Sequence, residues 1–199
     1  MATRERWNHN LHYHRWVLAQ LPPAPVRVLD VGCGEGILAR EVSARGHSAV
    51  GIDLDGRSIA LAMATPEPRV QYVLGDVMAH AFAAGSFDAV VSVATLHHLE
   101  PADALARMAD LLRPGGRLAV IGCARSGWRP QDIGHEVAAA IVNRARAPFT
   151  TYWEHSAPQV WPPAHTYQEL RTLAAATLPG SVFRRRLYWR YSLAWMKPG

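Results

Sequence analysis

The sequence predicts an α/β fold, in which a mostly parallel β-sheet is covered by helices on both faces. Short apolar runs rich in β-branched residues alternate with segments of helical spacing through residue 122, an alternation typical of βα units. The first apolar run ends in a glycine-rich turn, as strands that carry a ligand loop often do. Because crossovers between parallel strands are right-handed, only a few sheet topologies are compatible with this order of elements.

Five strands and three helices are expected in this part of the chain. The strands cover residues 27–31, 48–53, 69–74, 87–93 and 117–122, and the helices cover residues 37–45, 57–64 and 101–112. Gly46 follows the first helix as a C-cap would, and Pro101 opens the third at its first position. Residues 114–116, Pro-Gly-Gly, predict a turn before the fifth strand.

The pattern changes beyond residue 122. Residues 132–147 predict a helix, whereas residues 148–165 contain four prolines and several aromatic residues and predict an irregular, substrate-side loop. Thr166 and Glu169 match a capping box, so a helix should run from there to about residue 177. Side chains of alternating character over residues 181–196 predict a closing pair of strands.

Size and composition indicate one globular domain. The chain has 199 residues, of which 49% are hydrophobic and 19% charged. Its apolar runs are far shorter than the roughly 20 residues of a membrane-spanning helix, and its N-terminus has no secretory-signal pattern. The two cysteines, Cys33 and Cys123, have no partner at metal spacing and are expected to be reduced. We therefore expect a cytoplasmic protein without a membrane partner.

A net charge of +5 raises the question of a nucleic-acid partner. The basic residues form one cluster, residues 184–186 with Arg190 and Lys197, and this cluster lies in an expected strand. A solvated basic edge explains it better, so nucleic-acid binding is not expected.

The most informative segment is the glycine loop after the first strand. It reads Val28-Leu-Asp-Val-Gly-Cys-Gly-Glu-Gly36, a strand followed by Gly32, Gly34 and Gly36 and then by a helix. Glycines at these positions allow sharp turns and a close backbone approach to a ligand. A dinucleotide site favours GxGxxG, but residue 37 is Ile. The GxGxG spacing preceded by Asp30 instead suits a nucleoside joined to a charged amino-acid tail.

Two further acids end the next two strands. Asp53 ends the second strand, where an acid accepts hydrogen bonds from ribose hydroxyls in doubly wound sheets. Asp76 ends the third strand beside the same crevice, where it could accept from an adenine amine. Asp53 is preferred to Asp55 for the ribose, since Asp55 is expected to cap the following helix.

At motif level, residues 26–122 resemble the class I S-adenosylmethionine-dependent methyltransferases. The resemblance rests on the glycine loop, Gly51-Ile-Asp53, Gly75-Asp-Val77, Phe87-Asp-Ala-Val-Val-Ser92, Leu96-His-His-Leu99 and Leu112-Arg-Pro-Gly-Gly116. It implies a Rossmann-like sandwich with a seven-stranded sheet in the order 3-2-1-4-5-7-6. It also implies a single domain, with an N-terminal helical lid (1–24), a cofactor-binding core (25–122) and a substrate-side part (123–199).

The resemblance implies a role for each motif residue toward S-adenosylmethionine. Gly32, Cys33, Gly34 and Gly36 belong to the loop at the methionine tail and ribose, Asp30 helps to hold the tail, Asp53 binds the ribose, Leu54 packs on the adenine, Asp76 and Val77 contact its edge, and Ala94 offers a carbonyl to the methionine amine. The group most similar to this chain acts on small molecules, so a small-molecule acceptor is expected.

Histidines provide candidate catalytic groups. His97 and His98 come after the fourth strand, where the methyl group should point, and either could take a proton from an acceptor. The alternative is that one is buried and the other caps a helix. Tyr13 and His14 are expected lid contacts of the substrate. No carboxylate or cysteine lies at a spacing that would complete a set of metal ligands with the N-terminal histidines, so no metal ion is expected.

The residues after the fourth strand narrow the acceptor chemistry. Ala94-Thr-Leu-His97 is neither the Asn/Asp-Pro-Pro-Tyr of amino-group methylation in DNA bases or protein glutamine nor a cysteine nucleophile for cytosine C5. Tyr152 and Trp153 are candidate walls of an acceptor pocket. Three alternatives stay open: use of the cofactor without methyl transfer, an RNA-directed methyltransferase, and a nucleotide-dependent oxidoreductase. A monomer and a homodimer are both compatible with the sequence.

Overall fold

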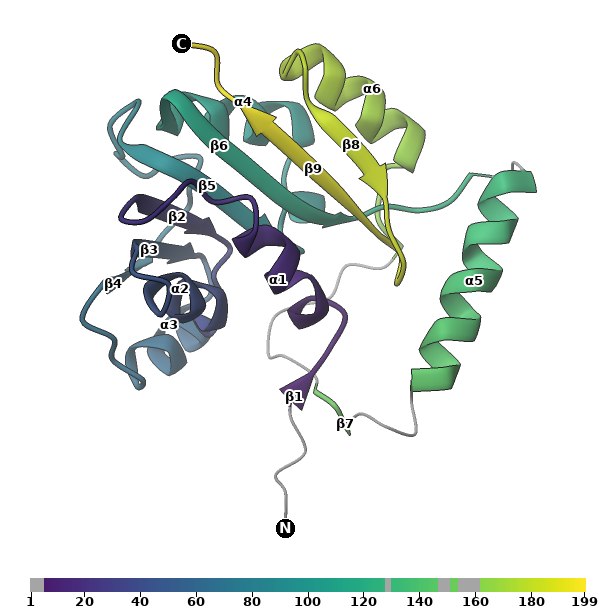
Figure 1. Cartoon of the computed structure of the whole chain (residues 1–199), viewed down its shortest axis with the longest axis horizontal. Helices are drawn as coiled ribbons and strands as arrows, with labels where there is room; N and C mark the ends of the chain where they lie inside the picture. The colour runs from purple at the N-terminus through teal and green to yellow at the C-terminus, as the bar shows by residue number, and fades with distance from the viewer. Residues whose placement is uncertain (1–5, 128–129, 147–150, 154–161) are drawn as a thin grey trace.

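A computed structural model describes residues 6–127, 130–146, 151–153 and 162–199. Its main feature is a seven-stranded sheet in the order β4-β3-β2-β5-β6-β9-β8 (Figure 1). The strands are β2 (Arg27–Val31), β3 (Ser48–Asp53), β4 (Val70–Leu74), β5 (Phe87–Val93), β6 (Leu112–Cys123), β8 (Val182–Arg185) and β9 (Arg190–Met196). The first five are parallel, and β9 is antiparallel to both β6 and β8. The predicted sheet and its strand order are confirmed.

Helices cover both faces of this sheet. The helices of the described residues are α1 (Leu11–Leu18), α2 (Ile37–Ser43), α3 (Gly56–Met63), α4 (Pro101–Leu111), α5 (Pro130–Arg146) and α6 (Tyr167–Thr177), with a short 3-10 turn η1 (Leu96–His98). One buried cluster joins the sheet to α4 and α6, and a second joins it to α1 and α2. In Figure 1, α5 stands apart from the sheet. The core therefore consists of two apolar layers separated by the strands.

The structure extends β6 beyond its predicted start. A turn was expected at residues 114–116, but the strand already begins at Leu112, directly after α4. Leu112 pairs with Phe87 of β5, but the next pair is Ala89 with Arg117, so residues 113–116 form a bulge between them. Gly115 in this bulge has a φ of 76°, which agrees with the predicted turn, and the backbone of Lys197 holds it by accepting from Gly115 N and donating to the Gly116 carbonyl.

A second sheet was not expected. It consists of two parallel two-residue strands, β1 (Arg6–Trp7) and β7 (Thr151–Tyr152), and is extended by a hydrogen bond from Trp153 N to the Trp7 carbonyl at 2.9 Å. This pairing fastens the N-terminal segment to the part predicted as irregular. Most of residues 148–165 lie outside the described part of the chain.

Local signals in the sequence explain several helix ends. The Thr166 hydroxyl accepts from Glu169 N, and the Glu169 carboxylate accepts from Thr166 N, which completes the predicted capping box. Pro101 starts α4, as predicted. Among the described residues, no helix has the length and apolar character needed to cross a membrane.

Candidate active site

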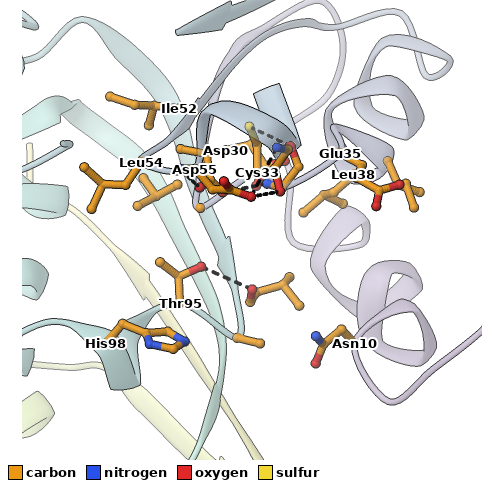
Figure 2. A pocket seen from close by; sticks show the side chains of 18 of the residues that line it. Asn10, Asp30, Cys33, Glu35, Leu38, Ile52, Leu54, Asp55, Thr95 and His98 are labelled. Carbon is orange, nitrogen blue, oxygen red and sulfur yellow. Dashed lines mark hydrogen bonds between the residues drawn. The ribbon is translucent and has the colours of Figure 1, made fainter. Parts of the chain in front are cut away.

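A cavity of about 550 Å³ lies at the carboxyl ends of β2, β3 and β5 (Figure 2). This is the edge at which open parallel sheets bind ligands. Its described lining residues come from these strand ends and the segments that follow them, from the end of β4, from α3, from the N-terminal segment and from the residue after β7: Asn8, Asn10, Leu11, His14, Asp30, Val31, Gly32, Cys33, Gly34, Glu35, Ile37, Leu38, Ile52, Asp53, Leu54, Asp55, Ser58, Gly75, Asp76, Val77, Val93, Ala94, Thr95, His98, Leu99 and Trp153. The cavity collects most of the predicted site residues.

The glycine loop forms one wall, and its shape depends on left-handed backbone angles. The φ angles of Gly32, Gly34 and Gly36 are 73°, 52° and 74°. A Cβ on Gly32 would collide with the Thr95 side chain, and a Cβ on Gly36 would collide with the hydroxyl of Tyr72. A Cβ on Gly34 would meet no protein atom within 4 Å, so the space beside it is open to a ligand. Gly36 itself does not line the cavity.

The backbone N–H groups of this loop are used inside the protein. Gly32 N and Cys33 N donate to the Ile52 carbonyl at 2.8 and 3.1 Å, and Gly36 N donates to the Cys33 carbonyl at 2.9 Å. Gly34 N donates to Oδ2 of Asp53 at 2.8 Å. A phosphate-binding loop needs such groups for the anion. Their engagement disfavours a pyrophosphate at this position.

Asp53 and Asp55 are placed differently, and the capping role predicted for Asp55 is confirmed. Asp55 accepts from the N–H groups of Arg57 and Ser58 and caps α3. Asp53 lines the cavity, and its Oδ1 accepts from Asp55 N at 2.9 Å. Because a carboxylate can accept about four hydrogen bonds, Asp53 retains acceptor capacity for a ligand.

Asp30 is the most unusual charged group of the site. It is only 2% exposed, accepts from the backbone N–H of Ala39, and has an Oδ2 atom without a hydrogen-bond partner among the described residues. Burial, followed by the negative charge of Asp53, raises the pKa of Asp30 to about 7. A ligand cation would satisfy this carboxylate.

The opposite part of the cavity is apolar. Leu54 lines it and is 66% exposed, an open surface suited to a flat ring. Val77 is buried beside it, and Oδ1 of Asp76 accepts from Met78 N at 2.9 Å. Ala94 lines the cavity with a φ of 56°, a strained value for a residue with a Cβ.

The two histidines after β5 are placed differently. His98 lines the cavity next to Thr95 (Figure 2), whereas His97 does not line it. Burial lowers the pKa of His98, an effect opposed by the charge of Asp53. Burial, then His98 and Arg190, lowers the pKa of His97 to about 4, and its Nδ1 has no partner in the described structure. The geometry therefore favours His98 over His97 as a group that meets a ligand.

The N-terminal segment covers the cavity through Asn8, Asn10, Leu11 and His14. The Asn8 amide donates to the Trp153 carbonyl at 3.3 Å, while its oxygen accepts from Asn10 N and Leu11 N. The Asn10 oxygen accepts from Nη2 of Arg190 at 2.8 Å. These bonds connect the segment to the residue that follows β7 and to β9.

Of the four residues predicted to contact the substrate, two line the cavity. His14 and Trp153 line the cavity. Tyr13 is buried elsewhere, with its hydroxyl donating to the Leu187 carbonyl at 2.9 Å. The backbone of Tyr152 is in β7, and its side chain lies outside what the structure describes.

The three N-terminal histidines take different partners. His14 lies 3.0 Å from Glu41, His9 lies 2.9 Å from Oδ1 of Asn143, and His12 packs edge-on against Tyr188. In the described ranges, no three His, Cys, Asp or Glu side chains form a group that could hold a metal ion.

Sequence reasoning missed the residues that support the glycine loop from outside the motif. The Tyr72 hydroxyl donates to the Gly36 carbonyl at 3.3 Å, and Nη1 of Arg40 donates to the Glu35 carbonyl at 2.8 Å. Thr95 occupies the space that a Cβ on Gly32 would need. No local pattern marks these residues, because their contacts link different strands and helices.

This donor and acceptor set fits S-adenosylmethionine. Oδ2 of Asp30, which has no hydrogen-bond partner among the described residues, suits an ammonium group. The remaining acceptor sites of Asp53 suit hydroxyls, and the open surface of Leu54 suits an adenine ring. The space at Gly34 admits a ligand directly against the backbone. Within the described part of the chain, the lining contains no Lys or Arg, which suits a ligand with a cationic centre.

Fold and site together define an S-adenosylmethionine-dependent methyltransferase of class I, and comparisons with known proteins agree. Residues 29–120 match the family model of the methyltransferase domain. An uncharacterized methyltransferase of Mycobacterium tuberculosis is 38% identical over 197 residues, which cover 96% of this chain and 98% of that protein. The chain therefore belongs to the class I S-adenosylmethionine-dependent methyltransferases.

Two more distant matches extend the comparison. A ubiquinone biosynthesis O-methyltransferase of Ralstonia nicotianae is 36% identical over 108 residues, covering 52% of this chain and 45% of that protein. An N-methyltransferase of Haemonchus contortus, solved with phosphomonomethylethanolamine and S-adenosylhomocysteine, matches with a TM-score of 0.66 and 17% identity. That match covers 100% of this chain and 55% of the other, and it shows the shared fold.

Proposed function

We propose that this protein transfers the methyl group of S-adenosylmethionine to an O, N or C nucleophile of a small molecule. The observation that carries the proposal is the arrangement of Asp30 and Asp53 on either side of the glycine loop. One carboxylate is buried with an oxygen that has no partner among the described residues, and the other is partly exposed in the same cavity. This pair suits an ammonium group and a ribose on one ligand.

The cofactor would lie along the carboxyl ends of β2, β3, β4 and β5. Asp30 and the carbonyl of Ala94 would hold the ammonium of the methionine tail, and Gly32, Cys33 and Gly34 would line its path. Asp53 would accept from the ribose hydroxyls. Leu54, Asp76 and Val77 would enclose the adenine. All these residues line the cavity, which supports the assignment.

When bound, S-adenosylmethionine supplies a methyl group already activated by its positive sulfur. The protein's task is then to hold the acceptor in line, a positioning effect that can contribute about 7–11 kcal/mol. His98 is the candidate base for an acceptor that must lose a proton. Its lowered pKa keeps the imidazole neutral, and hence able to accept a proton, at neutral pH.

The charges of the cavity favour a neutral or cationic acceptor. Among the residues that the structure describes, five carboxylates line it, from Asp30, Glu35, Asp53, Asp55 and Asp76, and no Lys or Arg does. An anionic acceptor would be repelled there. The name of the Ralstonia relative, an O-methyltransferase of ubiquinone biosynthesis, supports a small-molecule acceptor. A cytoplasmic location and the choice between monomer and homodimer stay predictions.

An RNA acceptor receives less support, because the arginine cluster is engaged within the protein. Arg185 donates to Oγ of Ser126 at 2.6 Å, and Arg186 donates to Oγ of Ser192 at 2.8 Å. Cations held in this way are less available to phosphates. Steep salt dependence of RNA affinity would favour this second candidate.

The test compares ligands and then acceptors. Calorimetry and thermal-shift measurements should detect binding of S-adenosylmethionine and of S-adenosylhomocysteine to the protein, but no binding of NAD. Methyl-labelled cofactor is then incubated with neutral phenols, amines and carboxylic acids, and label should appear in a phenol or an amine. Stabilisation by NAD alone would overturn the proposal. Tight cofactor binding without label transfer to any acceptor would indicate use of the cofactor without methyl transfer.

A further inference from the structure

A histidine–glutamate pair, of which the histidine is buried and the glutamate partly exposed, borders the cavity outside the glycine loop. His14, on α1, is 8% exposed and lines the cavity. Its Nδ1 lies 3.0 Å from Oε2 of Glu41 on α2. Because a carboxylate only accepts hydrogen bonds, Nδ1 must donate, and this fixes the ring with Nε2 directed to other partners.

The pair lies at the Asp30 end of the cavity. Asp30 accepts from the backbone N–H of Ala39, two residues before Glu41 on the same helix. The charge of Glu41 also contributes to the raised pKa of Asp30, which requires that the two carboxylates are near each other. His98, the other histidine of the lining, belongs to η1 after β5, beside Thr95 (Figure 2).

An amino-acid tail brings a second charge to this end. Its carboxylate is attached to the same carbon as the ammonium, so an ammonium at Asp30 places an anion close to three protein carboxylates, those of Asp30, Asp53 and Glu41. This anion would be repelled unless a donor or cation met it. The amides of Gly32, Cys33, Gly34 and Gly36 already donate to protein acceptors. Among the described residues of the lining there is no Lys or Arg, and the side chains that can carry a positive charge are His14 and His98; of these two, His14 is the one paired with Glu41.

We propose that His14, oriented by Glu41, is the binding subsite for the α-carboxylate of the cofactor's amino-acid tail. This inference rests on the proposed function. The imidazolium form donates from Nδ1 to Glu41 and from Nε2 to the ligand carboxylate. Since His14 is on α1, the tail connects the N-terminal segment to the core, and the segment closes on ligands that carry the carboxylate.

The test uses two ligands that differ in the carboxylate alone. S-adenosylmethionine and decarboxylated S-adenosylmethionine share the adenosyl group, the sulfonium and the amine. Calorimetry measures their dissociation constants for the wild type, His14→Ala, Glu41→Gln and Arg15→Ala. Arg15 is the matched control, because it is an exposed cation on the same helix and does not line the cavity.

His14→Ala should weaken the binding of S-adenosylmethionine by about 10- to 100-fold, because a hydrogen bond between charged groups is lost. Binding of the decarboxylated ligand should change by less than about twofold, because this ligand has no carboxylate for His14 to contact. Glu41→Gln should show the same selectivity with a smaller loss, and Arg15→Ala should affect neither ligand. Hydrogen exchange of residues 11–18 should slow with S-adenosylmethionine and not with the decarboxylated ligand.

Equal weakening of both ligands by His14→Ala would overturn the inference, since it would indicate a structural role. Unchanged binding of S-adenosylmethionine in both the His14 and the Glu41 variant would overturn it as well. In these two cases the wild type still binds the cofactor, so the proposed function survives. A wild-type protein that binds neither ligand would overturn both.

Discussion

The carboxylate of Asp53 accepts a hydrogen bond from the backbone N–H of Gly34 at 2.8 Å. This bond joins the end of β3 to the glycine loop after β2, and a second bond joins Asp53 to Asp55 N at 2.9 Å. The residue predicted to bind the ribose therefore also holds the loop in shape. Loop geometry and ligand affinity depend on the same side chain.

Asp53→Ala should weaken the binding of S-adenosylhomocysteine by about 10- to 100-fold, because hydrogen bonds to a charged group each contribute roughly 1.5–3 kcal/mol. Asp53→Asn keeps one oxygen acceptor and should lose less. Asp103→Ala removes an exposed carboxylate from the first turn of α4 and is the matched control. Calorimetry provides the three dissociation constants. Wild-type affinity in Asp53→Ala would contradict the ribose assignment.

Gly32→Ala should destabilise the protein and abolish cofactor binding. The residue has a φ of 73°, and its new Cβ would collide with Thr95. Left-handed backbone costs an L-residue about 1–2 kcal/mol, to which the collision adds. Gly134→Ala, in α5 with open space around it, should instead leave stability unchanged or raise it by about 0.5–1 kcal/mol. Urea unfolding compares the two variants, and equal stability would refute the prediction.

Asp30 should make the stability of the ligand-free protein fall as pH rises. Its pKa is raised from 3.8 to about 7, so the folded state binds more protons than the unfolded chain between these values. The free energy of unfolding therefore decreases through this window, by at most roughly 4 kcal/mol at about 1.4 kcal/mol per pKa unit. Asp30→Asn cannot ionise and should lack this decrease.

Thermal melting of the wild type and Asp30→Asn from pH 4 to 8 checks this. The advantage of the variant should grow up to about pH 7 and then level off, as the linkage of a single group requires. Parallel melting curves across the range would show that Asp30 stays ionised in the folded protein.

His98→Gln should lower the methyl-transfer rate by about 100-fold or more for an acceptor that must lose a proton, the size typical of general-base catalysis. Cofactor affinity should remain close to that of the wild type. His97→Gln should have a smaller effect on rate, because His97 does not line the cavity. Single-turnover rates with labelled cofactor separate the two. A larger loss in His97→Gln would reverse the assignment.

Most of the fold could be predicted because its signals are local. Buried parallel strands are continuous apolar runs, and caps such as Thr166 with Glu169 mark helix starts within a few residues. The start of β6 could not be predicted, because it depends on the pairing of Leu112 with Phe87 of the neighbouring strand across a bulge. The β1–β7 pair was missed for the same reason, as two residues carry no periodic pattern.

The candidate site was predictable where a motif ties chemistry to a strand end. Asp30, Gly32, Asp53 and Asp76 could be assigned from their positions at the ends of successive strands, and all line the cavity. The two histidines after β5 could not be distinguished, since only packing buries His97 away from the cavity and leaves His98 in its lining.

The sequence by itself determined the alternation of strands and helices, the glycine loop and the acids that end the strands, since each depends on neighbouring residues. Tertiary structure decided which side chains meet. It placed His14 of α1 against Glu41 of α2 and packed Tyr72 and Thr95 against the glycine loop. It also directed the backbone N–H groups of the loop to acceptors within the protein. Such contacts join residues distant in the chain, and their geometry is set by the packing of the whole sheet.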